Sequence, residues 1–291
     1  MKKIHVPLVT AKSILLALLL PFQLSAQVDK IKESNMPFES RQHIVGSLEE
    51  RYLVSGETNS PFTLFVYLPP TYTDTQRKYP LMIINDASLM TGLAKSTFDC
   101  LTMLQEIPEA IVVGIAYPPD NTLNLARNRF RDMTPTHSEG FDPSGKADSY
   151  IAFIKNELLP YIENNYRVDT TDKCFFGHSL GGLLGAYILV EQPELFNRYI
   201  IGSPSLFWDN FVVVKRLSEK SSVAAGNIKA VYTYVGGGEG DMMIKPIEKF
   251  HEFLQIKTGG TIKTHSQVFQ GENHLSVIPA AFSTAVKFVY K

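Results

Sequence analysis

The stretch Gly177-His178-Ser179-Leu180-Gly181-Gly182 decides the fold of this chain. It follows the apolar run Cys174-Phe175-Phe176 and precedes the apolar segment 183–190, which is typical of a helix. A strand, a Gly-x-Ser-x-Gly turn and a helix together form the nucleophile-elbow pattern. Such a sharp turn needs glycines because the helix must pack closely against the strand. The doubled glycine favours this interpretation over an ordinary glycine-rich turn, and Ser179 is the predicted nucleophile.

Two backbone N–H groups are expected to stabilise an oxyanion near Ser179. Leu180 follows the serine at the start of the predicted helix, where the helix dipole favours negative charge. The second donor should lie after the apolar run Leu81-Met82-Ile83-Ile84, in the stretch Asn85-Asp86-Ala87-Ser88. Ala87 or Ser88 has the right place in chain order, although an ordinary turn at the end of a strand is the alternative.

Composition narrows the class of protein. The chain has 291 residues, of which 44% are hydrophobic and 20% charged, and its formal net charge is −1. No basic stretch is dense enough to follow a phosphate backbone, so we expect no nucleic-acid partner. Cys and His do not occur at metal-ligand spacing, and we expect no metal and no other cofactor. The sequence does not predict an oligomeric state.

The N-terminus has the pattern of a secretory signal peptide. Lys2-Lys3 precede an apolar core, Ile14 to Leu20 with Phe22, that is too short to span a bilayer. Cleavage is expected after Ala26, and an uncleaved N-terminal anchor is the alternative. The mature protein is therefore predicted to be exported, in the periplasm, and free of the membrane after signal cleavage.

Strands and helices alternate along the rest of the chain. After an opening strand or hairpin within 38–54, short apolar runs indicate strands and amphipathic segments indicate helices. The expected strands are 62–68, 81–84, 110–117, 174–176, 198–203, 230–235 and 264–269, and the expected helices are 95–106, 147–166, 183–190, 242–258 and 278–290. This alternation predicts an α/β fold with a mostly parallel sheet and helices on both faces.

The domain prediction is a signal peptide over 1–26, a mobile lead-in over 27–37 and a single domain over 38–291. The chain carries no internal repeat and no second hydrophobic core. Residues 121–144 are rich in Arg, Asp, Thr and Pro, and we expect them to form a long functional or lid-like loop. Pro160 is expected to kink or break the helix over 147–166.

A base and an acid should follow Ser179 in the chain. His274 comes after the last predicted strand and before the closing helix, which makes it the candidate general base. Glu239 and Asp241 follow the strand 230–235 and are the candidate acids. Asp is a strong N-cap residue, so Asp241 could instead cap the next helix, and this favours Glu239. A Ser–His dyad without an acid also remains open.

The chain resembles the bacterial putative esterase family of α/β-hydrolases, and within it the trilactone siderophore esterases, which are enterobactin and salmochelin hydrolases. Four stretches carry the resemblance: 79–86, Ile111 to Ile115, Arg129-Phe130-Arg131-Asp132-Met133-Thr134-Pro135, and the elbow. It implies an α/β-hydrolase fold, serine hydrolase activity and no metal. Ser179 and His274 match the nucleophile and base, and Glu239 matches the acid of a Gly-x-x-Glu loop. Where relatives commonly have Leu-Asp-Gly, this chain has Asn85-Asp86-Ala87.

The expected function is hydrolysis of carboxylic esters through an acyl-enzyme intermediate, on siderophore-like esters. A carbohydrate esterase that removes feruloyl or acetyl groups, or a binding protein on a hydrolase fold, is the alternative. The expected partner is accordingly a small-molecule or glycan ester. Arg129, Arg131 and Asp132 could bind an anionic substrate or hold the long loop through ion pairs, and the structural role is favoured. Phe130 and Phe207-Trp208 could form aromatic walls around an acyl or catechol group of the substrate, or they could belong to the hydrophobic core, and the sequence favours neither.

Overall fold

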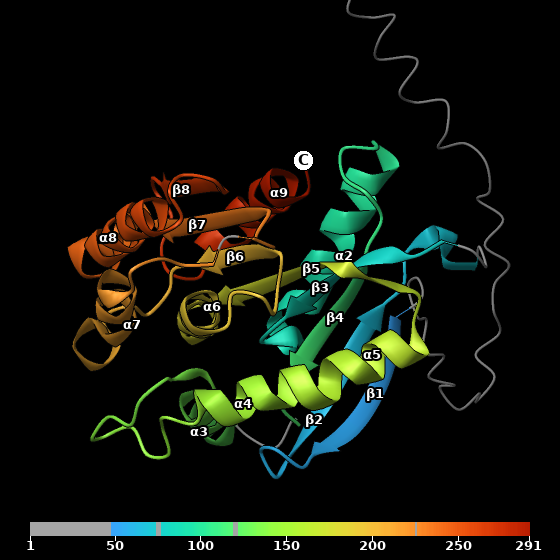
Figure 1. Ribbon diagram of the computed structural model, residues 1–291. Helices are drawn as coiled ribbons and strands as arrows, with labels where there is room; N and C mark the ends of the chain where they lie inside the picture. The colour runs from blue at the N-terminus through green and yellow to red at the C-terminus, as the bar shows by residue number, and fades with distance from the viewer. Residues whose placement is uncertain (1–47, 74–76, 119–121, 225) are drawn as a thin grey trace, which may run out of the picture. The chain divides into compact units, whose positions relative to one another are not determined.

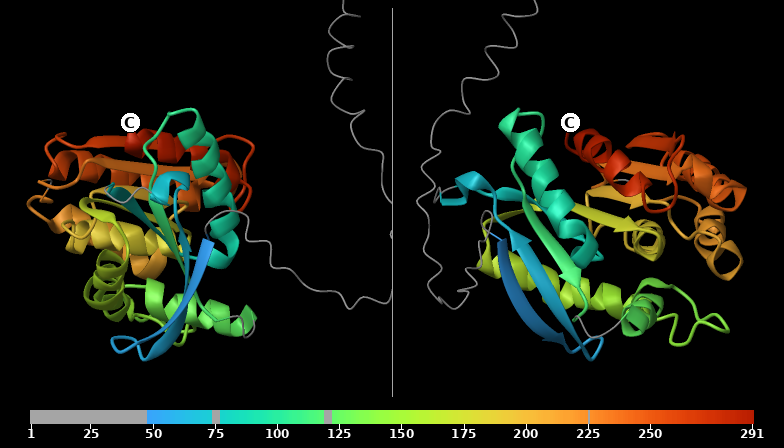
Figure 2. Two further views of the ribbon diagram at one scale, coloured as in Figure 1. Left: turned by 90° about the vertical axis from the view of Figure 1, so that its right-hand side faces the viewer. Right: turned by 180° about the vertical axis from the view of Figure 1, so that it is seen from behind.

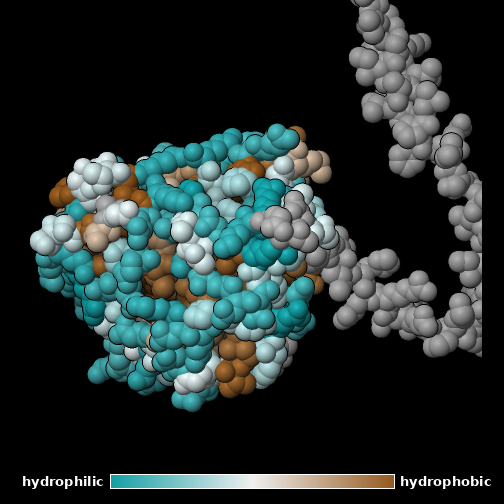
Figure 3. Space-filling view, turned by 45° about the vertical axis from the view of Figure 1, so that its right-hand side comes forward, coloured by the Kyte–Doolittle hydropathy of each residue, from teal (hydrophilic) through white to brown (hydrophobic). Residues whose placement is uncertain are grey.

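The computed structural model describes residues 48–73, 77–118, 122–224 and 226–291. The predicted signal peptide and lead-in lie outside the described residues. No helix within these ranges is long and apolar enough to cross a membrane. Hydrophobic side chains appear only in small, separated areas of the largely hydrophilic face in Figure 3.

A single sheet of eight strands organises the described residues (Figure 1). Its strands are β1 (Leu48–Ser55), β2 (Ser60–Tyr67), β3 (Tyr79–Ile84), β4 (Ile111–Ala116), β5 (Val168–His178), β6 (Arg198–Gly202), β7 (Ala230–Gly236) and β8 (Lys263–Phe269). The order across the sheet is β1-β2-β4-β3-β5-β6-β7-β8. The pairs β1–β2 and β2–β4 are antiparallel. All other pairs are parallel, which confirms the predicted mostly parallel sheet.

Helices cover both faces of the sheet, as predicted (Figures 1 and 2). They are α2 (Ala87–Met103), α3 (Thr122–Met133), α4 (Ala147–Phe153), α5 (Leu159–Asn165), α6 (Leu180–Glu191), α7 (Trp208–Glu219), α8 (Asp241–Lys257) and α9 (Val277–Tyr290). Alternate side chains of β3 enter two separate cores. Leu81 and Ile83 pack on the face of α4 to α8, whereas Met82 and Ile84 pack against α2 and α9.

The structure corrects the sequence prediction for residues 121–144. Their first half is the helix α3, and only the second half is a loop. The sequence TLNLARNRFRDM is polar enough to suggest a loop. In the folded chain two of its arginines, Arg129 and Arg131, are paired with carboxylates, so the polar segment can form a helix against the rest of the protein. The helix α7 was not predicted either, and α2 begins eight residues before the predicted start at 95.

The interruption predicted near Pro160 is a π-helical turn. Residues Ile154–Leu158 (η3) form this turn between α4 and α5, and Pro160 is the second residue of α5. A proline has no N–H to donate, and the wider π turn accommodates it without ending the helix. The direction of the chain is therefore maintained up to Asn165.

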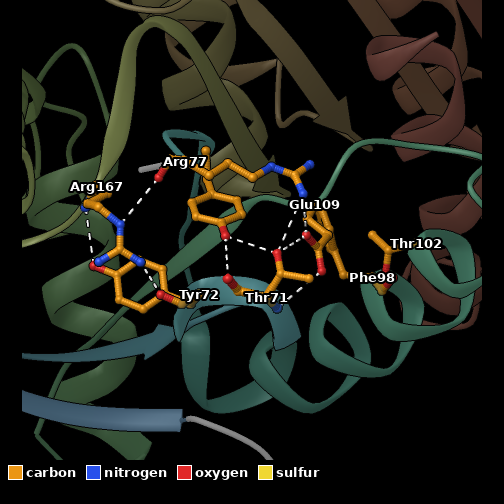
Figure 4. A network of polar contacts seen from close by, with 8 residues as sticks. Thr71, Tyr72, Arg77, Phe98, Thr102, Glu109 and Arg167 are labelled. Carbon is orange, nitrogen blue, oxygen red and sulfur yellow. Dashed lines mark hydrogen bonds and ion pairs between the residues drawn. The ribbon is translucent and has the colours of Figure 1, made fainter. Parts of the chain in front are cut away.

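Polar contacts join the segments that lead into the amino ends of β3, β4 and β5 (Figure 4). Arg77 contacts Glu109 at 2.9 Å, and the hydroxyl of Thr71, in the short 3₁₀ helix η2 (Pro70–Thr73), donates to the same carboxylate. The guanidinium of Arg167 lies 4.1 Å from the ring centre of Tyr72. These contacts anchor the sheet where it carries no candidate catalytic residue.

Candidate active site

Ser179 lies on the sharp turn between β5 and α6 that its sequence pattern predicts. Its φ of 62° and ψ of −119° are strained values for a residue with a side chain. A Cβ on Gly177 would lie 2.0 Å from the carbonyl oxygen of Gly181, and one on Gly182 would lie 2.6 Å from that of Gly202. Both glycines are therefore required, because strand and helix approach backbone to backbone.

Two helices begin beside Ser179. Leu180 is the first residue of α6 and Ala87 the first residue of α2. The first N–H groups of a helix have no partner within the helix and carry its positive dipole end. Asp86, immediately before Ala87, adopts a left-handed conformation with φ 56°, which turns the chain from β3 into α2. Both predicted oxyanion donors are thus helix N-terminal groups.

His274 follows β8 and pairs with Glu239, which follows β7. The imidazole Nδ1 lies 2.5 Å from Oε2 of Glu239. The Glu239 side chain is only 4% exposed, whereas that of His274 is 40% exposed. A buried carboxylate that holds Nδ1 leaves Nε2 of the same ring free to exchange a proton with a nucleophile.

Asp241, the other candidate acid, lies elsewhere. Its side chain is 75% exposed and forms an ion pair of 2.6 Å with Lys245, one helical turn further along α8. It also makes no side-chain capping bond, because Gly240 is the N-cap of α8. The structure therefore brings Glu239, and not Asp241, to His274.

Ser203 is a site residue that the sequence analysis missed. It lies at the end of β6, fully buried, with a left-handed φ of 35°. Its hydroxyl donates to Oε1 of Glu239 at 2.6 Å, and the N–H of Gly236 donates to the same oxygen at 2.8 Å. Burial works to raise the pKa of Glu239, but the hydrogen bonds from Ser203, His274 and Gly236 hold it below its ordinary value. Nothing in the sequence around Ser203 indicates this role.

His178, the residue before Ser179 in the elbow, supports His274. Its Nε2 lies 2.8 Å from the carbonyl oxygen of His274 and must carry the proton, because a carbonyl only accepts. Its Nδ1 lies 3.3 Å from the hydroxyl of Tyr234. Burial lowers the pKa of His178 to about 3, so the ring is neutral at physiological pH. His178 therefore fixes the backbone of His274 without adding charge.

Asn85, the residue after β3, has a side-chain donor without a hydrogen-bond partner. Its side chain is 1% exposed, and its Oδ1 accepts a hydrogen bond of 2.8 Å from Tyr150 of α4. Its Nδ2 is buried without a hydrogen-bond partner. This hydrogen bond from Tyr150 fixes the start of the turn that leads from β3 to Ala87.

The arginines of the 129–135 stretch form ion pairs. Arg129 makes a bidentate pair with Asp86, at 2.8 and 3.0 Å, which joins α3 to the turn before α2. Arg131 makes a second bidentate pair with its neighbour Asp132, at 2.7 and 2.8 Å. Both pairs agree with the structural role that the sequence favours.

The aromatic residues form a cluster beside the second half of the predicted loop. Phe130 lies 6.0 Å from Trp208 and 5.0 Å from Phe141, measured between ring centres. Trp208 is buried and donates to the carbonyl of Thr136, whereas Phe207 is 40% exposed. Phe130 and Trp208 thus pack the loop against α7.

The candidate nucleophile Ser179 and the candidate base His274 line a cavity of about 420 Å³. Ser179, His178 and His274 line it together with Asn85, Asp86 and Arg129. Apolar side chains complete the wall: Leu89, Met90, Leu125, Phe176, Leu275 and Ile278. The nucleophile and the base predicted from the sequence therefore face the same space.

The family described as putative esterase matches residues 55–284 of the chain. The chain is 27% identical over 268 residues to the ferri-bacillibactin esterase BesA of Bacillus subtilis. The aligned residues make up 86% of this chain and 91% of that protein. The crystal structure of the BES protein from Bacillus cereus superposes with a TM-score of 0.75 at 24% identity, over 87% of this chain and 99% of that one.

The siderophore hydrolase EstA of Aspergillus nidulans gives a TM-score of 0.74 at 20% identity, over 88% of this chain and 99% of that one. These solved structures share the α/β-hydrolase fold, which confirms the fold implied by the resemblance. Because the family match spans most of the described residues, the chain belongs to the putative esterase family and is a serine esterase.

Proposed function

We propose that the protein hydrolyses a carboxylic ester with Ser179 as nucleophile, His274 as general base and Glu239 as the acid that orients it. The observation that carries this assignment is the contact between the buried carboxylate of Glu239 and His274, which lines the same cavity as Ser179. The dyad alternative is disfavoured because two further donors, Ser203 and Gly236, hold Glu239 in its ionised form.

The reaction follows from these positions. His274 takes the proton of the Ser179 hydroxyl as its oxygen attacks the ester carbonyl, and Glu239 stabilises the imidazolium that results. The N–H groups of Leu180 and Ala87 receive the oxyanion of the tetrahedral intermediate. His274 then returns the proton to the leaving alcohol and an acyl-enzyme remains. Water, deprotonated by His274, releases the acid and regenerates Ser179.

The proposed substrate is a small siderophore-like ester. The relative from Bacillus subtilis is named a ferri-bacillibactin esterase, and its match covers 86% of this chain and 91% of that protein. Two further relatives matched by sequence are named siderophore esterases. A cavity of about 420 Å³ suits part of a small molecule. A solved structure named ferulic acid esterase is also similar, with a TM-score of 0.64 at 20% identity. We prefer the siderophore-like ester because relatives matched by sequence are named siderophore esterases.

Hydrolysis of p-nitrophenyl acetate by the wild type and by Ser179→Ala, His274→Ala, Glu239→Ala and Asp241→Ala tests the assignment. We expect the Ser179 and His274 variants to lose at least about 10³-fold in kcat, and Asp241→Ala, the matched acidic control, to keep wild-type kcat. Wild-type activity in Ser179→Ala, or a greater loss in Asp241→Ala than in Glu239→Ala, would contradict the proposed roles.

We also propose that the protein is exported to the periplasm. The support is the sequence pattern of Lys2-Lys3, the apolar core and the small residues before Gln27. Fractionation of cells that make the full chain, followed by N-terminal sequencing, should find a periplasmic protein that begins at Gln27. A cytoplasmic protein that keeps Lys2-Lys3 would refute export.

A further inference from the structure

Three phenylalanines of the described residues have exposed side chains, and all three lie close to the buried Trp208 in sequence or in space. Phe207 and Phe211, at the start of α7, are 40% and 41% exposed. Phe141 is 45% exposed, and its ring centre lies 5.3 Å from that of Trp208. Single exposed apolar side chains are ordinary, but a group of them marks a binding surface. We call Phe141, Phe207 and Phe211 the phenylalanine patch.

The backbone that carries Phe211 is strained. Asp209, Asn210 and Phe211 have φ values of 43°, 51° and 65°, which lie in the left-handed region that is unfavourable for residues with a Cβ. This turn leaves much of the Phe211 ring in contact with water, so the fold gains little burial from it in return. Strained backbone of this kind is characteristic of segments that bind a ligand.

The phenylalanine patch borders the reaction cavity on two sides. In α3, Arg129 lines the cavity, and the next residue, Phe130, lies 5.0 Å from Phe141 between ring centres. Before α7, the N–H of Ser205 donates to the carbonyl of Ser179 at 3.2 Å, two residues before the patch begins. The helix α7 and the loop between α3 and α4 lie on the same side of the molecule (Figures 1 and 2). A substrate too large for the cavity of about 420 Å³ can therefore extend onto the patch.

We propose that the phenylalanine patch binds a flat aromatic group of the substrate, outside the cavity in which the ester is cleaved. The inference rests on the proposed function and adds a second binding surface to the same site. Phenyl faces stack on planar rings, and this stacking contributes beyond the apolar area that is buried. An aromatic group should therefore bind better than a saturated group of equal size.

The test compares benzamide esters with cyclohexanecarboxamide esters, which carry a saturated ring of similar size. The ring is placed once in the acyl part, as in ethyl 4-benzamidobutanoate, and once in the alcohol part, as in 4-benzamidobutyl acetate, so that both orientations of the ester are covered. Acid release is followed by pH-stat titration, and the rate with Ser179→Ala is subtracted. We expect kcat/KM for the benzamide ester to exceed that for its saturated counterpart by about threefold or more in at least one pair.

The double variant Phe207→Leu/Phe211→Leu tests whether the patch causes this preference. Leucine keeps an apolar side chain but has no aromatic face, so the ratio between the two esters should fall to less than about half of its wild-type value, whatever happens to the absolute rate. Tyr52→Leu is the matched control. Tyr52 is an aromatic residue of the edge strand β1 that is 67% exposed and does not line the cavity, and its variant should keep the wild-type ratio.

A wild-type ratio below about threefold in both pairs would overturn the inference. An unchanged ratio in Phe207→Leu/Phe211→Leu, or hydrolysis of p-nitrophenyl acetate without hydrolysis of any test ester, would overturn it as well. All these results leave the esterase proposal intact if p-nitrophenyl acetate reacts. If neither that ester nor any test ester reacts faster with the wild type than with Ser179→Ala, the proposed function fails and the inference fails with it.

Discussion

Replacing Glu239 with Gln should impair the enzyme more than replacing it with Ala. In the wild type, Oε1 accepts hydrogen bonds from Ser203 and from the N–H of Gly236, while Oε2 faces Nδ1 of His274. The Ser203 hydroxyl can rotate, but the Gly236 N–H can only donate. The amide oxygen of Gln is therefore expected at the Oε1 position, which turns the amide NH₂ towards His274.

An NH₂ group opposite Nδ1 stabilises the tautomer that carries its proton on Nε2, which cannot accept the proton of Ser179. Reversing the amide would leave the Gly236 N–H without an acceptor, at a cost of about 1–3 kcal/mol, or about 5- to 150-fold in population. Loss of the anion beside the imidazolium removes about another 1.5–3 kcal/mol of charge-assisted hydrogen bonding. The product of the two effects is a fall in kcat of about 10² to 10⁴.

Glu239→Ala loses only the anion beside the imidazolium, because water in place of the side chain favours neither tautomer of His274. Its kcat should therefore fall by about 10- to 150-fold. The assay is kcat for p-nitrophenyl acetate, with circular dichroism as a check that both variants are folded. A Gln variant that is as active as the Ala variant or more active would refute the reasoning, because the amide would then not be oriented by Gly236.

Three further predictions follow from the same contacts. Gly177→Ala should destabilise the fold by more than about 3 kcal/mol, because the new Cβ would lie 2.0 Å from the carbonyl oxygen of Gly181. Gly92→Ala in α2 should be neutral or stabilising, because nothing lies within 4 Å of the added Cβ. The free energies of unfolding in urea should distinguish the two variants. Because the pKa of Glu239 is lowered in the folded state, its contribution to stability is present above the ordinary carboxyl pKa of 4.5 and is lost as pH falls through the folded value. Glu239→Gln should therefore show a shallower loss of stability on acidification than the wild type, and equal slopes would contradict this. Tyr234→Phe removes only the 3.3 Å contact to His178 and should lower kcat by less than about fivefold, whereas a larger loss would mean that Tyr234 acts on substrate directly.

The parts of the site that the sequence predicted are those imposed by sterics and chain order. Gly177 and Gly182 are dictated by the close approach of two backbones, so the elbow is visible in the sequence. His274 follows from its place after the last strand. Ser203 could not be found this way, because it reaches Glu239 only when β6 and β7 lie side by side.

The polar segment 122–133 could not be identified as a helix for a related reason. Its arginines are compatible with a loop until Arg129 meets Asp86, which is 43 residues earlier in the chain. The supporting role of His178 could not be predicted from the sequence either. Its contact with the carbonyl of His274 crosses 96 residues and depends on the folded sheet.

The strand order also bears on how this family can diversify. Ser179, Glu239 and His274 follow β5, β7 and β8, whereas Leu89 and Leu125, which also line the cavity, belong to α2 and α3. A substitution at Leu125 or Leu89 changes which ester fits and leaves the contact between His274 and Glu239 untouched. Selection can therefore act on substrate range and on chemistry through separate sets of positions, so that new specificities arise on an unchanged catalytic centre.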